Sequence, residues 1–237
     1  MTVIRSILYA VWLYASMTFA GLVCLPVILA DRRRALIAGR LWTRMALWGL
    51  RWIVGAKVVF KGLEHVPTGA AILAMKHQSM LDTLAPFLLV PKPAFVLKKE
   101  LMNAPVFGFY AGVMDMIPID REAHASALKG LLRASRPARD AGRQIVIFPE
   151  GTRQEPGETG EYKPGVAALY KDLGVPCIPV ALDTGRIWAA HGLIRRKGVA
   201  TIELLPPIPP GLPRDEFMRT LQERIETRSA ELLAAQP

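Results

Sequence analysis

Cysteine is scarce in this sequence, with only Cys24 and Cys177 among 237 residues. Cys24 lies in an apolar segment and Cys177 in an expected strand, so the pair has neither a zinc-binding spacing nor the pattern of a disulfide framework. This scarcity excludes a small disulfide-stapled fold and fits a reducing compartment. The sequence also lacks an internal repeat and any cluster of metal ligands, so no metal is expected.

Acidic residues are the minority charge. The chain has 20 Asp and Glu against 30 Lys and Arg, a formal net charge of +10. Such a surplus points to an anionic partner: a membrane surface, a nucleic acid or a phosphorylated substrate. Hydrophobic residues make up 51% of the chain and the mean hydropathy is +0.26. Because nucleic-acid-binding proteins are seldom this apolar, we expect anionic membrane lipid as a partner and no nucleic acid.

Charge is absent from Ile7 to Ala30, a run rich in Leu, Val, Ile, Trp and Tyr. A bilayer-spanning helix needs roughly 20 such residues. A cleaved signal peptide is disfavoured because the run is too long and is followed by Asp-Arg-Arg-Arg rather than by a small-residue cleavage site. The basic residues after the run place that side in the cytoplasm, which predicts a membrane protein, such as one of a bacterial inner membrane, with its site on the cytoplasmic face.

The next segment, 35–54, has the pattern of a second helix. Leu41, Met45, Trp48 and Trp52 recur at helical spacing among arginines. This pattern suits a helix lying in the membrane interface, although an ordinary amphipathic helix packed on a core would look similar. One spanning helix and a shallow helical hairpin both fit. We therefore expect residues 1–55 to anchor the chain to a membrane and residues 56–237 to form the globular domain.

Strands and helices alternate along the globular part, which predicts an α/β fold with a mostly parallel sheet flanked by helices. Pro137 should kink or interrupt one of the helices, and apolar residues on one face predict a terminal helix. Expected strands cover 57–62, 70–75, 93–97, 116–121, 144–148, 175–182 and 199–205, and expected helices cover 84–90, 105–113, 124–142 and 164–173, with the terminal helix presenting Phe217, Leu221, Ile225 and Leu232.

The segment from Lys76 to Asp82 turns polar directly after a buried strand, where α/β folds place their chemistry. With His77 in the loop and Asp82 in the first helical turn, the carboxylate can reach the imidazole ring. A carboxylate on one ring nitrogen fixes the tautomer and leaves the other nitrogen free as a general base. The alternative is structural: Ser79 caps the helix and Asp82 merely satisfies a loop histidine.

Two further strand ends, at Ile119–Arg121 and Phe148–Arg153, also carry charge. In a parallel sheet the carboxyl ends share one edge, so these residues and His77 could line one crevice. Gly151 allows a sharp turn that exposes backbone amides, and an arginine suits a phosphate bidentately. Alternatively, Glu150 and Arg153 pair with each other across a turn, and the segment ending at Arg121 is a solvated turn.

Four sequence blocks in order resemble the glycerolipid acyltransferases. His77-Gln-Ser-Met-Leu-Asp82 matches their H-x4-D motif and Phe148-Pro-Glu-Gly-Thr-Arg153 their FPEGTR motif. Ile117-Pro-Ile-Asp-Arg121 looks like the block that ends in a substrate-binding arginine, and Val175-Pro-Cys-Ile-Pro-Val180 resembles a V-P-x-x-P-V strand. The resemblance covers residues 57–210. Two departures bear on acceptor preference: Lys76 stands where Asn is frequent, and Gln154 where Ser is common.

The resemblance implies transfer of a fatty acyl group from acyl-CoA or acyl-carrier protein to the sn-2 hydroxyl of lysophosphatidic acid, giving phosphatidic acid without a cofactor. His77 would be the general base, oriented by Asp82. No G-x-S-x-G nucleophile motif is present, so no acyl-enzyme is expected. An apolar tunnel, walled by 93–97 and 105–113, would measure the acyl chain. Substrate binding would fall to Arg121, Glu150, Gly151, Thr152 and Arg153, with Lys98 as a further contact to phosphate.

Three other functions compete with this interpretation. The acceptor could be another lysolipid, such as lyso-ornithine lipid. A lipid hydrolase would use the same base with water. A basic membrane-surface binding protein would need no catalysis, and its His77 and Asp82 would be together by coincidence. The remaining histidines, His65, His124 and His191, are expected to be surface or helix residues without a catalytic part.

Overall fold

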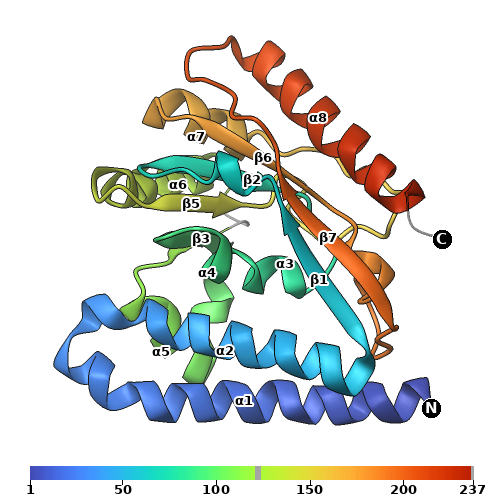
Figure 1. Ribbon diagram of the computed structural model, residues 1–237. Coiled ribbons are helices and arrows are strands. Elements are labelled where there is room, and N and C mark those ends of the chain that lie inside the picture. Colours follow the sequence, from blue (N-terminus) through green and yellow to red (C-terminus); the bar gives the residue numbers. More distant parts are fainter. Residues whose placement is uncertain (121–123, 236–237) are drawn as a thin grey trace.

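A computed structural model describes residues 1–120 and 124–235. Its centre is a seven-stranded sheet with the order β1-β7-β6-β2-β5-β3-β4 (Figure 1). The strands are β1 (Ala56–Lys61), β2 (Ala71–Met75), β3 (Pro93–Lys98), β4 (Ile117–Ile119), β5 (Gln144–Ile147), β6 (Cys177–Leu182) and β7 (Gly198–Leu204).

All neighbouring strands run parallel except β6 and β7, which pair antiparallel. The expected α/β fold with a mostly parallel sheet is therefore confirmed. Every residue of β2, β5 and β6 is buried, as central strands covered on both faces require. Because β6, β2, β5, β3 and β4 run in one direction, their carboxyl ends meet at one edge, as predicted for the crevice.

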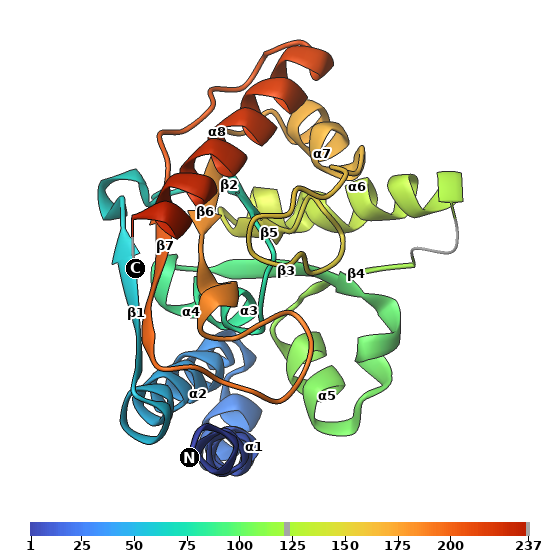
Figure 2. The ribbon, with the colours of Figure 1, turned by 90° about the vertical axis from the view of Figure 1, so that its right-hand side faces the viewer.

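Helices cover both faces of the sheet (Figure 2). On one face lie α6, α7 and α8, and on the other lie α1 to α5. The predicted apolar stripe of the terminal helix is confirmed, since Phe217, Leu221, Ile225 and Leu232 are all buried. The helices are α1 (Thr2–Ala30), α2 (Leu36–Gly49), α3 (Leu81–Leu84), α4 (Pro86–Leu89), α5 (Pro105–Val113), α6 (His124–Asp140), α7 (Gly165–Leu173) and α8 (Arg214–Ala234).

Helix α6 continues through Pro137, so the prediction of an interruption there is wrong. A proline costs most in a helix interior, where it removes a hydrogen bond to the carbonyl four residues earlier. Pro137 lies in the last turn of α6, and its own carbonyl still accepts a hydrogen bond from Ala141 N at 3.0 Å. The loss is confined to one hydrogen bond near the end of the helix.

Helices α1 and α2 lie side by side as a hairpin, and α2 separates α1 from much of the sheet (Figure 1). Small residues on α2 allow the close approach, because a Cβ on Gly49 would lie 2.2 Å from the Trp12 ring. Trp12 Nε1 also donates to Met45 O at 2.8 Å. The two helices therefore form a helical hairpin against the domain.

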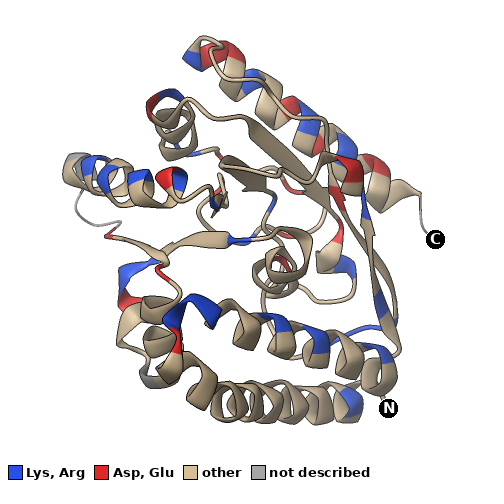
Figure 3. Cartoon of the chain, turned by 60° about the vertical axis from the view of Figure 1, so that its left-hand side comes forward, with Lys and Arg blue, Asp and Glu red and all other residues tan. Residues whose placement is uncertain are grey.

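The outer face of α1 is apolar and exposed along its length, and Figure 3 shows it almost without charge. The face expected on segment 35–54 is only partly exposed. Trp48 of α2 and Trp52 of the following π-helical turn are 53% and 67% exposed, whereas Leu41 and Met45 are half-buried. Helix α1 is the one described helix that is long and apolar enough to cross a membrane. An exposed apolar surface of this kind is typical of a site that contacts a membrane or another protein.

Candidate active site

His77 and Asp82 meet at the end of β2. His77 lies in the loop after the strand, and Asp82 lies in the first turn of α3. His77 Nδ1 is 3.1 Å from Asp82 Oδ2, and Asp82 is fully buried while the His77 side chain stays 13% exposed. The predicted contact is therefore present. Because Asp82 engages Nδ1, the ring nitrogen left for chemistry is Nε2.

The Asp82 carboxylate is oriented from several sides. Oδ2 accepts hydrogen bonds from the backbone N of Gln78 at 2.6 Å and of Ser79 at 2.7 Å. Oδ1 accepts from Ser79 Oγ at 3.1 Å and from Thr184 Oγ1 at 2.6 Å. Ser79 Oγ in turn accepts from Leu81 N at 3.1 Å. The N-cap position of α3 is occupied by Met80, so Ser79 precedes the cap position that the sequence suggests for it. The carboxylate is thus fixed before any substrate arrives.

Phe148, at the end of β5, stacks on the His77 ring with centroids 4.1 Å apart and planes 23° from parallel. Strands β2 and β5 are parallel neighbours, so their ends bring the H-x4-D and FPEGTR segments together. The stacking limits ring rotation of His77, which complements the in-plane restraint from Asp82.

The loop after β5 turns at Gly151, whose φ of +70° is a left-handed conformation that favours glycine. Glu150 points into the protein, where it is 2% exposed. Its Oε1 accepts from Lys76 Nζ at 3.0 Å and its Oε2 from His77 N at 2.8 Å. The alternative that Glu150 pairs with Arg153 is therefore wrong. Burial raises the pKa of the Glu150 carboxyl, and the neighbouring Lys76 ammonium opposes this shift.

Two cavities meet beside His77. The larger, about 610 Å³, is apolar and lies between β3, α5 and the α1–α2 hairpin. Its wall includes the expected segments, through residues such as Phe95, Leu97 and Phe107. The smaller, about 310 Å³, is lined by His77, Phe148, Gly151, Thr152, Arg153 and His191. Phe148 and Arg153 line both cavities, so an elongated apolar space leads to the imidazole and to a cation.

Only some of the predicted substrate-binding residues line the two cavities. Gly151, Thr152 and Arg153 surround the smaller cavity with His77. Lys98 lines neither cavity; its Nζ lies 3.7 Å from Glu100 Oε2 and its side chain is half exposed. Arg121 lies outside the described residues. Within the described ranges, no three His, Cys, Asp or Glu side chains gather as metal ligands would.

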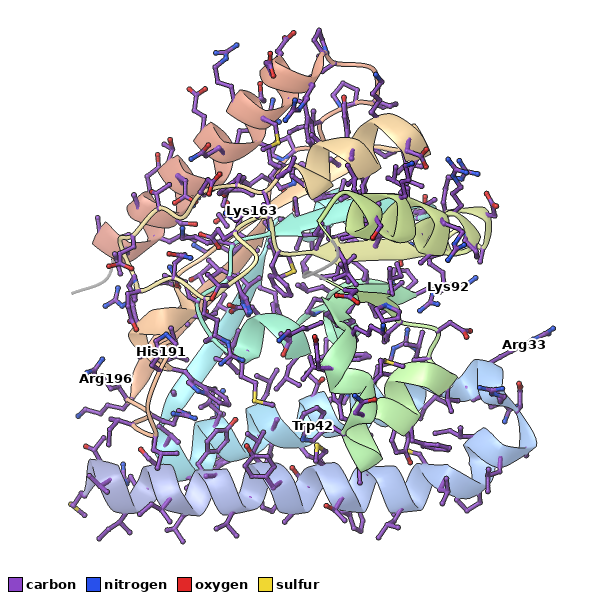
Figure 4. The ribbon with its side chains drawn as sticks, turned by 180° about the vertical axis from the view of Figure 1, so that it is seen from behind. Arg33, Trp42, Lys92, Lys163, His191 and Arg196 are labelled. Atoms are coloured by element: carbon purple, nitrogen blue, oxygen red, sulfur yellow. The ribbon has the colours of Figure 1, made fainter. Side chains whose placement is uncertain are left out.

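Three residues near the site are not identified by any local pattern in the sequence. His191 is exposed, as expected of a surface histidine, and it also borders the cavity of His77 from the loop between β6 and β7 (Figure 4). Thr184 reaches Asp82 across 102 positions of sequence, and Glu226 reaches Lys76 across 150. Only the fold brings these residues together, and no local pattern identifies them.

Comparison with known proteins identifies the family of the chain. Residues 57–183 match the family described as Acyltransferase. A 1-acyl-sn-glycerol-3-phosphate acyltransferase from Pseudomonas aeruginosa is 30% identical over 98% of this chain and 91% of its own. A protein of the same description from Cocos nucifera is 29% identical over 79% of this chain, which spans 60% of that relative.

The fold also has a counterpart among solved structures. The crystal structure of the 1-acyl-sn-glycerophosphate (LPA) acyltransferase PlsC from Thermotoga maritima superposes with a TM-score of 0.82 at 23% identity, covering 99% of this chain and 98% of the other. The match includes the N-terminal hairpin, because nearly the whole chain is covered. From its sequence match over the α/β domain and its similarity to curated relatives, this chain is an enzyme that belongs to the acyltransferase family.

Proposed function

We propose that the enzyme transfers a fatty acyl group from a thioester, acyl-CoA or acyl-carrier protein, to the sn-2 hydroxyl of lysophosphatidic acid and so forms phosphatidic acid. The observation that carries this proposal is the His77–Asp82 pair, 3.1 Å apart, at the junction of an apolar cavity with a cavity lined by Arg153. The names of the relatives in Pseudomonas aeruginosa and Cocos nucifera support the choice of acceptor.

His77 acts as the general base in this scheme. Nε2 takes the proton of the acceptor hydroxyl as its oxygen attacks the thioester carbonyl carbon. The tetrahedral intermediate then expels the thiolate of the donor, which the imidazolium can protonate. Asp82, held by Thr184 and by backbone amides, keeps Nδ1 protonated and stabilises the imidazolium.

The two cavities divide the substrates by polarity. The apolar cavity suits fatty acyl chains, because Phe95, Leu97 and Phe107 offer only carbon to its interior. Arg153 suits the acceptor phosphate, since a guanidinium binds phosphate through two parallel hydrogen bonds. Thr152 is a further donor beside the same cavity. The Gly151 amide already donates to Phe148 O at 3.0 Å, so Gly151 is proposed to shape the phosphate site through its left-handed turn. Arg121 and Lys98 remain predicted contacts to phosphate, Lys98 the weaker because it already lies near Glu100.

Membrane attachment follows from the nature of both lipids. A diacyl product leaves a bilayer only at a cost of about 0.8 kcal/mol per methylene group. The exposed apolar face of α1 and the exposed Val106, Phe107 and Phe109 of α5 suit contact with the bilayer. We place the enzyme on the cytoplasmic face of a bacterial inner membrane, where basic residues contribute about 1 kcal/mol each against anionic lipid.

The test is transfer of labelled palmitoyl from CoA to lysophosphatidic acid in membranes containing wild type, His77→Ala or His65→Ala. His65 lies in the turn between β1 and β2 and is the matched control for loss of an imidazole. We expect phosphatidic acid from wild type and His65→Ala and none above background from His77→Ala. Full activity of His77→Ala would contradict the mechanism. Activity only with lyso-ornithine lipid would show that this lipid, and not lysophosphatidic acid, is the acceptor. Release of free fatty acid without an acceptor would indicate a hydrolase.

A further inference from the structure

Lys76 is a buried cation that the proposed chemistry does not use. It is 1% exposed and directly precedes His77. Its Nζ donates to Glu150 Oε1 at 3.0 Å, to the backbone carbonyl of Glu158 at 3.0 Å and to Glu226 Oε2 at 2.7 Å. A buried ammonium is tolerated only when it is paired and hydrogen-bonded, and here every donor has a partner.

Glu226 contributes to this network from a distant element. It lies in the middle of α8, and α8 packs on the face of the sheet opposite to α1, α2 and α5 (Figure 2), the helices that contribute to the wall of the apolar cavity. Its Oε1 accepts from Tyr162 OH at 2.9 Å and its Oε2 from Thr159 Oγ1 at 3.2 Å. Helix α8 is therefore joined to Lys76 and also to segment 159–162, which follows the arginine loop (residues 149–154).

The network ends on the backbone of His77. Glu150, whose one oxygen holds Lys76, accepts with the other from His77 N at 2.8 Å. On the other side of the same residue, His77 O accepts from Gln154 N at 2.8 Å. The arginine loop thus holds the His77 backbone at both its N–H and its carbonyl, and Lys76 and Glu226 hold the arginine loop.

We propose that Lys76 and Glu226 are positioning residues of the acyltransferase site. Acting through Glu150, they hold His77 against the acceptor hydroxyl and Arg153 against the acceptor phosphate, and neither touches substrate. The kinetic test of this inference rests on the proposed function, because it uses lysophosphatidic acid and acyl-CoA as substrates. The charge balance supports it: two carboxylates surround one ammonium, and the excess acceptors are satisfied by His77 N, Tyr162 and Thr159.

The variants Glu226→Gln, Glu226→Ala and Lys76→Met test the proposal, with Glu223→Gln on the exposed face of α8 as the matched control. We expect Glu226→Ala to lower kcat by on the order of tenfold to a hundredfold, as displacements of about 1 Å do. We expect the KM for lysophosphatidic acid to rise and the KM for acyl-CoA to stay unchanged. Glu226→Gln keeps one acceptor oxygen and should retain more activity, and Glu223→Gln should match wild type.

The KM values distinguish a displaced site from a smaller amount of folded enzyme. A smaller amount of folded enzyme would lower the maximal rate and leave both KM values unchanged. That outcome would overturn the proposal. A double variant adds a second criterion: because Glu226 is proposed to act through Lys76, Glu226→Gln should cost little more in a Lys76→Met background. Additive losses in the double variant would contradict the proposed path.

Hydrogen exchange supplies a readout that needs no substrate. In Glu226→Ala, amides of 77–79 and 150–163 should exchange faster than in wild type, while those of β2, β5 and β6 should not change. If wild type proved inactive with lysophosphatidic acid, the proposed acceptor would be wrong. Hydrogen exchange would still show whether Lys76 and Glu226 hold His77 and the arginine loop in place. Unchanged exchange in both segments would overturn that role whatever the acceptor.

Discussion

Thr184 illustrates at the residue scale how much of the site depends on a single hydroxyl. It donates to Asp82 Oδ1 at 2.6 Å, and both residues are fully buried. Thr184→Val keeps the shape and removes the donor. A hydrogen bond to a charged group is worth about 1.5–3 kcal/mol, so we expect a loss of stability in that range. Because Asp82 would orient His77 less well, kcat should fall by about tenfold.

Thr43→Val is the control for Thr184→Val. Thr43 is equally buried and donates to Gly39 O at 2.8 Å and to Leu84 O at 3.3 Å, but its hydroxyl is not among the donors to the Asp82 carboxylate named above. Thermal unfolding and initial rates measured on both variants give the comparison. We expect both to lose stability and only Thr184→Val to lose turnover per folded molecule. Equal turnover in the two variants would refute a role of Thr184 in catalysis.

Gly151 and Gly142 have the same left-handed backbone conformation, but only Gly151 lies beside the proposed phosphate site. Comparing them separates the effect of the turn on stability from its effect on acceptor binding. Their φ angles are +70° and +67°, and a Cβ would meet Lys163 Cγ at 3.7 Å at Gly151 and nothing within 4 Å at Gly142. An alanine in this conformation costs about 1–2 kcal/mol. Gly151→Ala and Gly142→Ala should therefore be destabilised similarly in thermal unfolding, and only Gly151→Ala should also raise the KM for the acceptor. A normal KM in Gly151→Ala would show that the turn does not shape the phosphate site.

The histidine and aspartate of the site were predictable because they are five positions apart, within reach of one loop and one helical turn. The role of Glu150 was not predictable. Its local sequence is compatible with a salt bridge to Arg153, whereas its actual partners, Lys76 and His77 N, come from a neighbouring strand end. Hydrophobic periodicity identifies strands, but it does not specify which buried polar side chains meet between them.

At the scale of elements, the contact between α6 and α7 predicts a dependence of stability on pH. Arg136 Nη2 lies 2.7 Å from Asp172 Oδ1, and this hydrogen bond and charge lower the pKa of the Asp172 carboxyl. A depressed pKa in the folded state adds stability above the unfolded pKa of about 3.9, which is lost as the pH falls through the folded value.

Asp172→Asn tests that contact. Urea unfolding should show the variant slightly less stable than wild type at pH 7, because the Arg136 side chain is 54% exposed and an ion pair open to solvent contributes little. The difference should shrink as the pH falls from about 3.9 toward the lower folded pKa of Asp172, because the wild-type carboxylate then becomes protonated too. The exposed Asp140→Asn is the control with the same change of charge. A difference that grew in acid would contradict the sign argued here.

Helix α5 forms one wall of the apolar cavity and predicts its selectivity. Ala111 on α5 is 4% exposed and lines the cavity, so Ala111→Leu adds three carbon atoms to its interior. We expect competition assays with mixed acyl-CoA donors to shift toward shorter chains, with the KM for lysophosphatidic acid unchanged. Ala134→Leu, on the exposed surface of α6, is the control and should have the same acyl-chain preference as wild type. An unchanged preference in Ala111→Leu would show that acyl chains do not occupy this space.

Strand direction marks the limit of prediction at this scale. The alternation of strands with helices predicts parallel neighbours, and this holds for β2 through β6. Strand β7 has the same kind of apolar sequence, yet it pairs antiparallel with β6 and parallel with β1. No helix lies between β6 and β7, only a loop with the 3-10 turn at Thr184–Arg186, and a connection without a crossover helix permits the antiparallel pairing.

For the molecule as a whole, the sequence left open whether the first helix crosses the membrane or lies along it. Length and hydropathy are the same in both cases, so only packing discriminates between them. Contacts with the folded domain extend along α1: Arg195 N donates to Ser6 Oγ at 2.8 Å, and Tyr110 OH donates to Gly21 O at 2.5 Å. Near its end, Ile28 is buried with the core residues of the sheet.

A helix held by the domain at both of its ends cannot also reach the far side of the bilayer, because the domain would have to follow. We therefore predict that α1 lies in one leaflet, with its exposed apolar face toward the acyl chains and both ends on the cytoplasmic side. Thr2→Cys and Arg33→Cys place exposed thiols at the two ends, and Arg33 projects outward from the hairpin turn (Figure 4). The native Cys24 and Cys177 are buried, so wild type is the control for background labelling. A membrane-impermeant maleimide should label both variants in inside-out vesicles and neither in intact spheroplasts. Labelling of Thr2→Cys from the outside would show that α1 spans the membrane and that the hairpin opens when the enzyme inserts.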